Sequence, residues 1–311
     1  MKQKKIKVFA PASVSNVGPG FDMMGFALNE PGDEIEISLN GSREIKIKKI
    51  FGDGGTLPYH IDKNTTTVAI QSLLKKYNIN AGLDIVIHKK MGIGSGLGSS
   101  AASAVAGVFA VNKLLSLKLS KYELLEHAIA GEFIASKGIH ADNVAPCLFG
   151  GFVLIRSYDP IDIIQLDYPG NLYCSIVYPD IEIKTCDARA MLDKSVPLKT
   201  AIAQAGNASG LVTGLLTKNY DLISRSIIDH LAEPKRAKLI PCYSEVRNAA
   251  LSSGALNCNI SGSGPSMFAF SDSKKKAADI AHAMKKAAVS KGFNSKTYVS
   301  NINNKGPVVL K

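Results

Sequence analysis

The stretch MGIGSGLGSSAASAVAG, from Met91 to Gly107, joins alternating glycines and two adjacent serines to an alanine-rich segment typical of a helix. Glycines let the backbone approach a ligand closely and adopt positive φ, so successive N–H groups can converge on one anion. A following helix adds the partial positive charge of its N-terminus. Ser99 and Ser100 stand where an N-cap belongs, and their hydroxyls could also meet phosphate or magnesium. We expect an anion site; a flexible Gly/Ser turn is the simpler alternative.

Two familiar phosphate motifs do not match this stretch. A Walker A loop ends in Gly-Lys-Ser/Thr, and no lysine stands there. A dinucleotide fingerprint needs Gly-x-Gly-x-x-Gly, whereas Gly94, Gly96 and Gly98 alternate strictly and Ser99 occupies the third glycine position. The sequence therefore argues against both a P-loop and a Rossmann site.

Glu132 is a candidate metal ligand. It falls in a helix expected over residues 120–137, which begins with a capping box of Ser120 and Glu123. A carboxylate on an apolar helix face is costly unless a cation or a donor compensates it. Glu132 therefore either reaches water at the edge of that face or binds magnesium, which prefers one or two carboxylates plus phosphate oxygens. The predicted inward face also contains Leu125, Ala128, Ile129 and Phe133.

Two short polar clusters predict the wall of a small-molecule pocket. In PASVSNVGPGFD, residues 11–22, Asn16 and Asp22 flank a Gly-Pro-Gly turn that follows a strand. In GIHADNVAPCLFGG, His140, Asp142 and Asn143 crowd into a predicted turn before an apolar segment. Such residues can also serve only as local caps of turns.

These candidates must be positioned by an α+β chain of two similar-sized parts. Alternating or apolar runs predict strands, helical periodicity predicts helices, and DYPGN at 167–171 is a plausible boundary. The glycine-rich stretch falls between a strand and a helix. Strands are predicted at 5–13, 33–39, 43–50, 82–90, 150–155, 173–179 and in a hairpin at 257–271, and helices at 66–78, 186–194, 200–217, 222–232 and 274–292.

Composition excludes several classes. The 311 residues are 46% hydrophobic, and no apolar run reaches the length of a membrane span or a signal peptide, so a cytoplasmic protein is expected. The net charge is +11, but the lysines are scattered, and we expect no nucleic-acid partner. Five cysteines without a C-x-x-C spacing predict reduced, mostly buried thiols and no zinc site. They are Cys147, Cys174, Cys186, Cys242 and Cys258.

Taken together, three segments resemble the motifs of the GHMP kinase superfamily: residues 11–22, GIGSGLGSSAAS at 92–103 and NISGSGPSMFAF at 259–270. HADNVAP at 140–146 and EPKRAKLIP at 233–241 are most similar to the homoserine kinase family within it. The resemblance implies an N-terminal ribosomal protein S5 domain 2-like domain that binds ATP and a C-terminal ferredoxin-like GHMP kinase domain, with the site between them. We divide them as 1–165 and 166–311. The implied reaction is ATP-dependent phosphorylation of L-homoserine to O-phospho-L-homoserine, towards threonine.

The resemblance also implies roles for individual residues. Magnesium would be held by Ser100 and Glu132, and the catalytic group would be Asn143, Asn16 and Arg189. The homoserine site would comprise Asn16, Asp22, His140, Asn143, Thr185, Arg189 and Arg236. The ATP phosphates would be bound by Met91, Gly92, Ile93, Gly94, Ser95, Gly96, Leu97, Gly98, Ser99, Ser100 and Ala101, with Ser263 and Gly264 closing over them.

Chemistry supports this substrate separately. An amino acid needs a cationic clamp for its carboxylate, which Arg189 and Arg236 could form. It also needs an acidic or amide partner for its ammonium, which Asp22 with Asn16 could provide. Without the motifs, each arginine would be assigned to a surface ion pair.

The sequence departs from the superfamily at two points. Many members pair a catalytic Asp with a Lys near the first motif, but no lysine follows Lys7 until Lys46. Asp142 could match that Asp; we favour transfer without a dedicated base, with Asn143 orienting the hydroxyl. Relatives commonly carry Pro where Met91 or Gly92 stands. The alternatives are a mevalonate-type kinase and a non-catalytic nucleotide-binding regulator, and a homodimer is expected by analogy.

Overall fold

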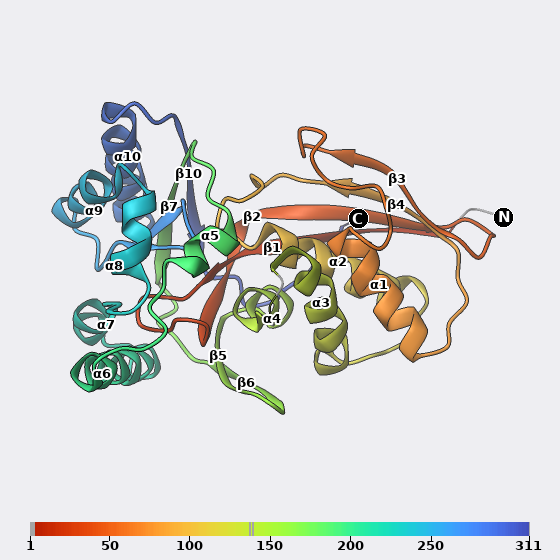
Figure 1. Ribbon diagram of the computed structural model, residues 1–311, viewed down its shortest axis with the longest axis horizontal. Helices are drawn as coiled ribbons and strands as arrows, with labels where there is room; N and C mark the ends of the chain where they lie inside the picture. The colour runs from red at the N-terminus through yellow and green to blue at the C-terminus, as the bar shows by residue number, and fades with distance from the viewer. Residues whose placement is uncertain (1–3, 137, 139, 311) are drawn as a thin grey trace.

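The computed structural model describes residues 4–136, 138 and 140–310 (Figure 1). Within them, one mixed sheet runs in the order β11-β1-β2-β4-β3, with β5 paired to β2 and β6 to β5. Only β3 and β4 pair in parallel. Its strands are β1 (Lys5–Ser15), β2 (Met24–Leu39), β3 (Ile45–Phe51), β4 (Leu83–His88), β5 (Phe152–Tyr158), β6 (Ile161–Leu166) and β11 (Val308–Leu310).

Helices cover one face of this sheet, and local sequence signals explain where two of them begin. The Asn64 side chain accepts a hydrogen bond from the Thr66 N–H at the start of α1. The predicted capping box of Ser120 and Glu123 begins α3. Helix α2 packs on β1 and β2 and is flanked by the others (Figure 1). The four are α1 (Thr65–Lys76), α2 (Ser99–Leu114), α3 (Lys121–Ser136) and α4 (Ala141–Phe149).

A second sheet lies at the other end of the molecule, in the antiparallel order β10-β7-β9-β8. Helix α10 packs on its face and on α9, while α6 and α7 pack on each other below them in Figure 1. The strands are β7 (Tyr173–Pro179), β8 (Asn259–Ile260), β9 (Met267–Ser271) and β10 (Ser295–Asn301). The helices are α5 (Thr185–Ala190), α6 (Leu198–Leu216), α7 (Tyr220–Ser226), α8 (Glu233–Arg236), the 3₁₀ turn η1 (Ala237–Leu239), α9 (Tyr243–Ser252) and α10 (Lys274–Ser290).

A cluster of phenylalanines joins the two sheets. Phe26 and Phe152 come from the first sheet and Phe268 and Phe270 from the second, with ring centroids of Phe26 and Phe270 5.1 Å apart. After β10 the chain returns to the first sheet, where Val309 in β11 pairs with Val8 in β1. The larger of two hydrophobic core clusters therefore contains residues from both halves and holds them together, while a second cluster lies within the second half. The division into 1–165 and 166–311 stays a prediction; residues 1–3 and 311 lie outside the described part.

Several local predictions are wrong. The turn predicted around His140 to Pro146 is helix α4, which contains Pro146. The helix predicted over 222–232 ends at Ser226, because the Asp229 carboxylate accepts hydrogen bonds from the N–H groups of residues 231–233 and stabilises a bend. The helix predicted over 186–194 ends at Ala190, and the predicted end of α3, Lys137, lies outside the described residues. Strands β6, β10 and β11 were not predicted.

Two predictions about side chains at the start of α2 and on α3 are also wrong. The N-cap of α2 is Gly98, not a serine, since the Ser99 and Ser100 hydroxyls turn to carboxylates instead. Phe133 is 49% exposed, because the inward line of α3 runs through Leu125 and Ala128 to Glu132.

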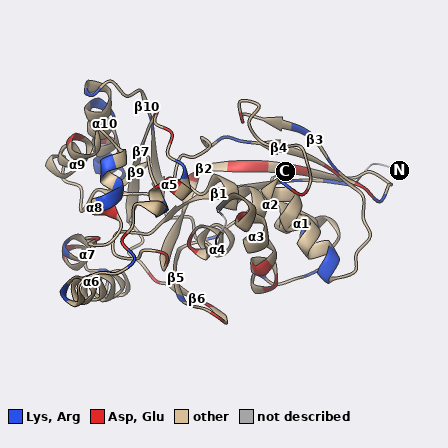
Figure 2. Cartoon of the chain, viewed as in Figure 1, with Lys and Arg blue, Asp and Glu red and all other residues tan. Residues whose placement is uncertain are grey.

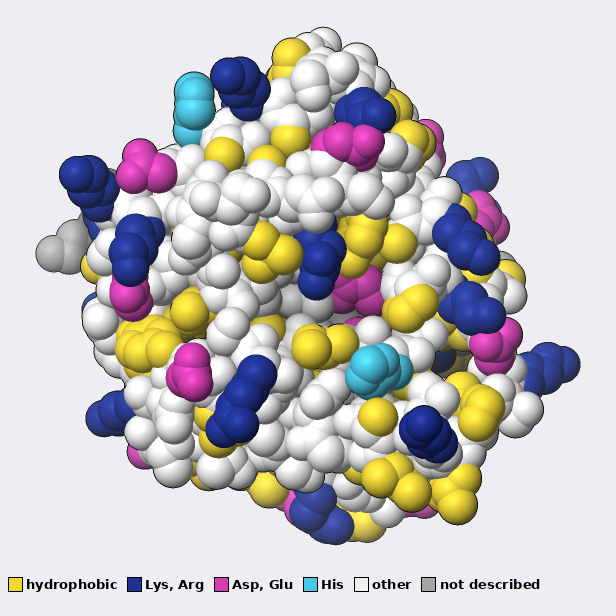
Figure 3. Space-filling model, turned by 90° about the vertical axis from the view of Figure 1, so that its left-hand side faces the viewer, with side chains coloured by type: hydrophobic (Ala, Val, Ile, Leu, Met, Phe, Trp, Pro, Cys, Tyr) yellow, Lys and Arg dark blue, Asp and Glu magenta, His cyan; other side chains and the backbone are white. Residues whose placement is uncertain are grey.

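The described residues include no helix long and apolar enough to cross a membrane. Lys and Arg are distributed along the chain, and the acidic residues of β2 pair with lysines of the neighbouring strand β1 (Figure 2). On the end of the molecule shown in Figure 3, basic side chains stand apart from one another among acidic and apolar ones. The predicted thiols are confirmed as free, and four of the five are buried, with Cys186 exposed.

Candidate active site

A cleft of about 390 Å³ lies where the glycine-rich loop meets the second half of the chain. Its walls come from the loop and α2, from α3 and α4, and from α5, α8 and the Gly262–Ser263 turn. All seven residues predicted to bind homoserine and both predicted metal ligands line it. Residues as far apart in sequence as Asn16 and Arg236 are therefore brought to one cavity, although their roles there remain predictions.

The loop between β4 and α2 opens backbone groups towards this cleft. Gly94, Gly96 and Gly98 have φ of +69°, +76° and +66°, the left-handed region that glycine favours. A Cβ on Gly98 would lie 2.1 Å from Ser13 Oγ, and one on Gly96 would lie 2.5 Å from the Ser261 carbonyl oxygen. With a glycine N-cap and no side-chain cap, the first N–H groups of α2 are offered to an anion.

Not every residue predicted for the phosphate site faces the cleft. Ile93 to Gly96, Gly98 to Ser100 and Ser263 line it. Met91, Leu97 and Ala101 are buried in the core with at most 2% exposure, so their side chains hold the loop in place. Neither Gly92 nor Gly264 lines the cavity; Gly92 lies under the Tyr178 ring. The other half closes on the loop through Ser261 Oγ, which donates to the Gly96 carbonyl at 2.6 Å.

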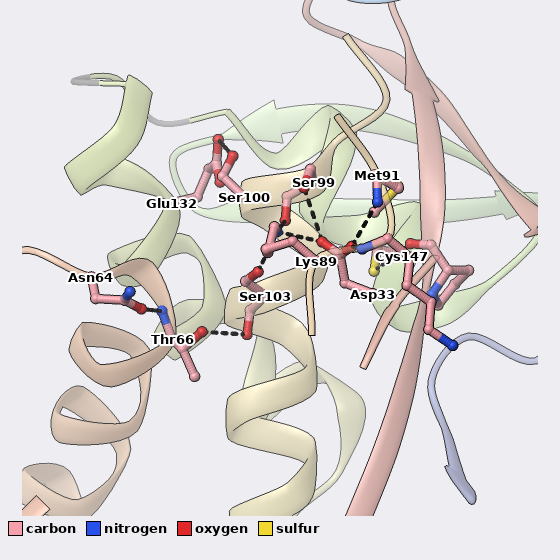
Figure 4. Close-up of polar contacts among 12 residues, drawn as sticks. Asp33, Asn64, Thr66, Lys89, Met91, Ser99, Ser100, Ser103, Glu132 and Cys147 are labelled. Atoms are coloured by element: carbon pink, nitrogen blue, oxygen red, sulfur yellow. Dashed lines mark hydrogen bonds and ion pairs between the residues drawn. The ribbon is translucent and has the colours of Figure 1, made fainter. Parts of the chain in front are cut away.

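The sequence analysis missed a buried ion pair under the loop. Lys89 Nζ bonds to the Asp33 carboxylate, and the two side chains are 3% and 0% exposed (Figure 4). A periodic signal could have found it: Ile85 and Ile87 point inward on β4, so Lys89 two residues on does so too, and Asp33 precedes the buried Ile35 in the same way. Glu34 faces His88 across the strands, so the next step brings Asp33 to Lys89.

Ser100 and Glu132 meet at the wall of the cleft. Ser100 Oγ donates to Glu132 Oε1 at 2.9 Å (Figure 4). Burial raises the pKa of Glu132 to about 7, the Ser100 hydrogen bond opposes that shift, and Asp142 adds to it. The described residues contain no cluster of three or more His, Cys, Asp or Glu that could hold a metal by itself. The Ser100–Glu132 pair fits a cation that takes its other ligands from phosphate and water.

Opposite the loop, a charged group spans the two halves. One Arg189 nitrogen donates to both oxygens of Asp22, each at 2.8 Å, and lies 3.4 Å from His140 Nδ1. The backbone N–H of Asp22 donates to Asn16 Oδ1 at 3.1 Å, which fixes the backbone at this position. Burial lowers the pKa of His140 and Arg189 lowers it further, which favours a neutral ring at pH 7.

A second arginine is buried beside this group. Arg236 is 3% exposed and donates to the Gly262 carbonyl oxygen at 2.8 Å. Asn16 Nδ2 donates to the same oxygen at 3.0 Å, so one side chain from each half of the chain is bonded to this backbone group. The Phe21 ring lies against both guanidinium groups. Its centroid is 5.2 Å from Arg236 Cζ and 5.5 Å from Arg189 Cζ. Arg236 is therefore not a surface residue, whereas Arg189, with its side chain 42% exposed, forms an ion pair with Asp22 at the wall of the cleft.

Between the two ends, Asn143 and Asp142 lie at the start of α4. Asn143 accepts from Ser13 Oγ at 2.9 Å and donates to Ser15 Oγ at 3.0 Å, so its amide is held in one orientation. Burial, with a smaller contribution from the Asp22 carboxylate, raises the pKa of Asp142 to about 7. Its Oδ1 has no hydrogen-bond partner among the described residues. Part of the Asp142 population is thus protonated near neutral pH.

The far end of the cleft is more apolar. Leu57, Pro58 and Ile134 line it together with Asn64 and Thr65. Leu57, Pro58 and Asn64 lie in the segment between β3 and α1, Thr65 begins α1, and Ile134 belongs to α3. Thr185 and Ser263 face each other across the opposite opening, with their hydroxyl oxygens 3.5 Å apart.

Comparison with known proteins agrees with this architecture. Residues 64–151 match the family described as GHMP kinases N terminal domain, and residues 211–290 match GHMP kinases C terminal. Two curated relatives named homoserine kinase come from *Chlorobium phaeobacteroides* (strain DSM 266) and *Chloroherpeton thalassium*. The first is 46% identical over 99% of this chain and 100% of its own length, and the second 47% identical over 90% and 91%. This chain belongs to the homoserine kinase family of GHMP kinases.

Solved structures support the same assignment of fold. A crystal structure of homoserine kinase from *Cytophaga hutchinsonii* shares 50% sequence identity with this family member and superposes with a TM-score of 0.97, covering 100% of this chain and 98% of that one. The mevalonate kinase of *L. major* in complex with R-mevalonate superposes at a TM-score of 0.73 with 17% identity, over 97% of this chain and 96% of that one. The second likeness shows the shared GHMP kinase fold alone.

Proposed function

We propose that the chain transfers the γ-phosphoryl group of ATP to the side-chain hydroxyl of L-homoserine. The observation that carries the choice of acceptor is the Asp22–Arg189 pair, since a zwitterion brings one charge of each sign. Its ammonium can replace Arg189 at Asp22 while its carboxylate takes Arg189 and Arg236. Mevalonate would bring only a carboxylate and leave Asp22 without a cation, which is costly in a partly buried site.

Phosphoryl transfer needs positioning and charge neutralisation more than covalent chemistry. We assign neutralisation to the loop amides and the N-terminus of α2, and orientation of the acceptor hydroxyl to Asn143, whose amide is fixed by Ser13 and Ser15. Asn16 and Arg189 hold the acceptor in place. A magnesium ion held by Ser100 and Glu132 would neutralise charge on the phosphates.

We propose that no dedicated base is needed and that the hydroxyl proton passes to the transferred phosphoryl group. Asp142 is the only other candidate that the sequence suggested. With its pKa raised to about 7, it is a weaker electrostatic partner than an ordinary aspartate but a possible proton acceptor. If Asp142→Asn lost several orders of magnitude in kcat while homoserine and ATP still bound, the base-free mechanism would be wrong.

The test of the function is a coupled ADP-release assay with homoserine, mevalonate and shikimate as acceptors. We expect release with homoserine, and phosphorus NMR should show the phosphate on the side-chain oxygen. Release with mevalonate alone would replace the proposed acceptor, and ATP binding without any turnover would identify a regulator.

We further propose that the chain is a homodimer in the cytoplasm. The support is the likeness to its relatives and the free, mostly buried cysteines, which suit a reducing compartment. Light scattering after size exclusion, at several protein concentrations, measures the mass directly.

A further inference from the structure

We propose that Asp33 positions the phosphate loop for the nucleotide, acting through Lys89 and the loop backbone without touching the ligand. The inference rests on the proposed function, because it takes the loop to bind the ATP phosphates. Asp33 is fully buried and does not line the cleft, so it cannot reach a ligand there. It is therefore a positioning residue.

One carboxylate holds both ends of the loop (Figure 4). Asp33 Oδ1 accepts the N–H groups of Lys90 at 2.8 Å and Met91 at 3.1 Å, where the loop leaves β4. Oδ2 accepts the Ser99 hydroxyl at 2.9 Å, where the loop becomes α2, and also bonds to Lys89. The start and the end of the loop are thus fixed to a single group on β2.

Lys89 extends this restraint into the helix. Besides Asp33, its ammonium donates to the Ser99 carbonyl oxygen at 2.8 Å and to Ser103 Oγ at 2.7 Å. An ammonium has three N–H donors, and these three partners use all of them. Lys89 therefore fixes the first turn of α2, whose N–H groups face the cleft, relative to the strand that precedes the loop.

The pairing is better explained by positioning than by stability. Buried ion pairs contribute little net stability compared with apolar residues of the same size, because removing both charges from water is costly. A fully satisfied polar network, in contrast, specifies one arrangement. The loop needs such a restraint, because three of its glycines have positive φ and glycine can adopt many other backbone conformations. Donors that are already oriented bind an anion without a cost of reorganisation.

The experiment compares Asp33→Asn/Lys89→Met with the wild-type chain. The double variant removes both charges together, keeps an amide oxygen for the Lys90 and Met91 N–H groups, and fills the volume of the lysine stem. Asp33→Asn alone would leave a buried ammonium without its counter-ion and serves only as the destabilised reference. The matched control is Ile37→Val, a fully buried residue on the same strand.

For the double variant we expect the KM for ATP to rise about tenfold or more, with the KM for homoserine changed less than about twofold. Calorimetric titration with ATP in the absence of acceptor should show the same loss of affinity. The midpoint of thermal unfolding of the double variant should lie close to that of Ile37→Val. Unchanged ATP constants in the folded double variant, or an equal rise in Ile37→Val, would overturn the proposal.

Ser103→Ala keeps the test decisive if the double variant does not fold. It removes one acceptor of Lys89 and leaves Asp33 in place. We expect a rise of about two- to fivefold in the KM for ATP and none for homoserine, as for one lost charge-assisted hydrogen bond. No change in either constant would count against the inference. A wild-type chain that binds no ATP would instead refute the proposed function.

Discussion

At the proposed nucleotide end of the cleft, a ligand would meet main-chain groups from one short segment, Ile93 to Ser100, whose ends are bonded to Asp33 and Lys89. At the acceptor end it meets side chains from segments far apart in sequence: Asp22 after β1, His140 before α4, Arg189 on α5 and Arg236 on α8. The first arrangement suits any nucleoside triphosphate. The second depends on the charge and shape of one substrate. In the proposed assignment, nucleotide binding is therefore encoded locally, whereas the choice of acceptor requires both halves of the chain.

The largest effect should come from Glu132→Gln, at the nucleotide end. Replacing the carboxylate by a neutral amide removes the proposed charge opposite magnesium, and we expect kcat/KM to fall roughly a hundredfold or more. Steady-state ADP release at several magnesium concentrations measures it. Retention of full activity at low magnesium would separate Glu132 from the metal. The variant should fold normally, since it no longer buries a charge.

Next comes Arg189→Met, at the acceptor end. Because the variant loses a charge-assisted contact to the substrate carboxylate, we expect kcat/KM for homoserine to fall about 10- to 100-fold. The KM for ATP should change less than about twofold. Initial rates with each substrate varied in turn give both constants. An equal rise in the KM for ATP would mean that the two ends are not independent, which would break the comparison.

Asp142 lies between the two ends and allows a test by pH. Its folded pKa of about 7 lies above its ordinary value of 3.8, so folding favours the protonated form. The stability that this provides is present below pH 4 and is lost as the pH rises to 7, by up to about 1.4 kcal/mol per pH unit. Asp142→Asn should therefore gain stability relative to wild type between pH 5 and 7.5, as measured by urea unfolding. A constant difference across that range would show that this carboxyl is not desolvated.

The smallest effect should come from Glu126→Gln, the matched control for Glu132 on the same helix. Glu126 is about half exposed and pairs with Lys76 at the surface. Exposed pairs contribute under about 1 kcal/mol, so we expect unchanged kinetics and a shift of less than about 0.5 kcal/mol in the free energy of unfolding. A loss of activity comparable to that of Glu132→Gln would indicate that α3 is sensitive to any loss of charge.

Local sequence patterns predicted most of the helices and strands, but fewer of the contacts between segments far apart in the chain. The glycine loop, the capping box of α3 and most strands were predicted because each depends on neighbouring residues. Helix α4 was not, since its polar start and Pro146 resemble a turn, and its helical state depends on packing against β1, α2 and α3. The short strands β10 and β11 depend on partners far along the chain. The cleft residues were placed by motif resemblance, because no local signal relates Asp22 to Arg189.

The Asp33–Lys89 pair is another contact between distant segments that local patterns alone do not predict. Alternation along each strand places both residues inward, but only the register between β2 and β4 brings them together. A lysine in an otherwise apolar series is easily assigned to solvent. Here its burial depends on a carboxylate more than fifty residues earlier.

The pairing of β11 with β1 has a consequence for the order in which the protein is made. Strand β1 leaves the ribosome long before the strand that covers its outer edge, Val308–Leu310, because β11 follows both sheets along the chain. Until then the nascent chain carries an open strand edge, to which other chains can pair. A truncated chain that lacked only Val308–Leu310 would retain every residue of the cleft but would expose the edge of β1.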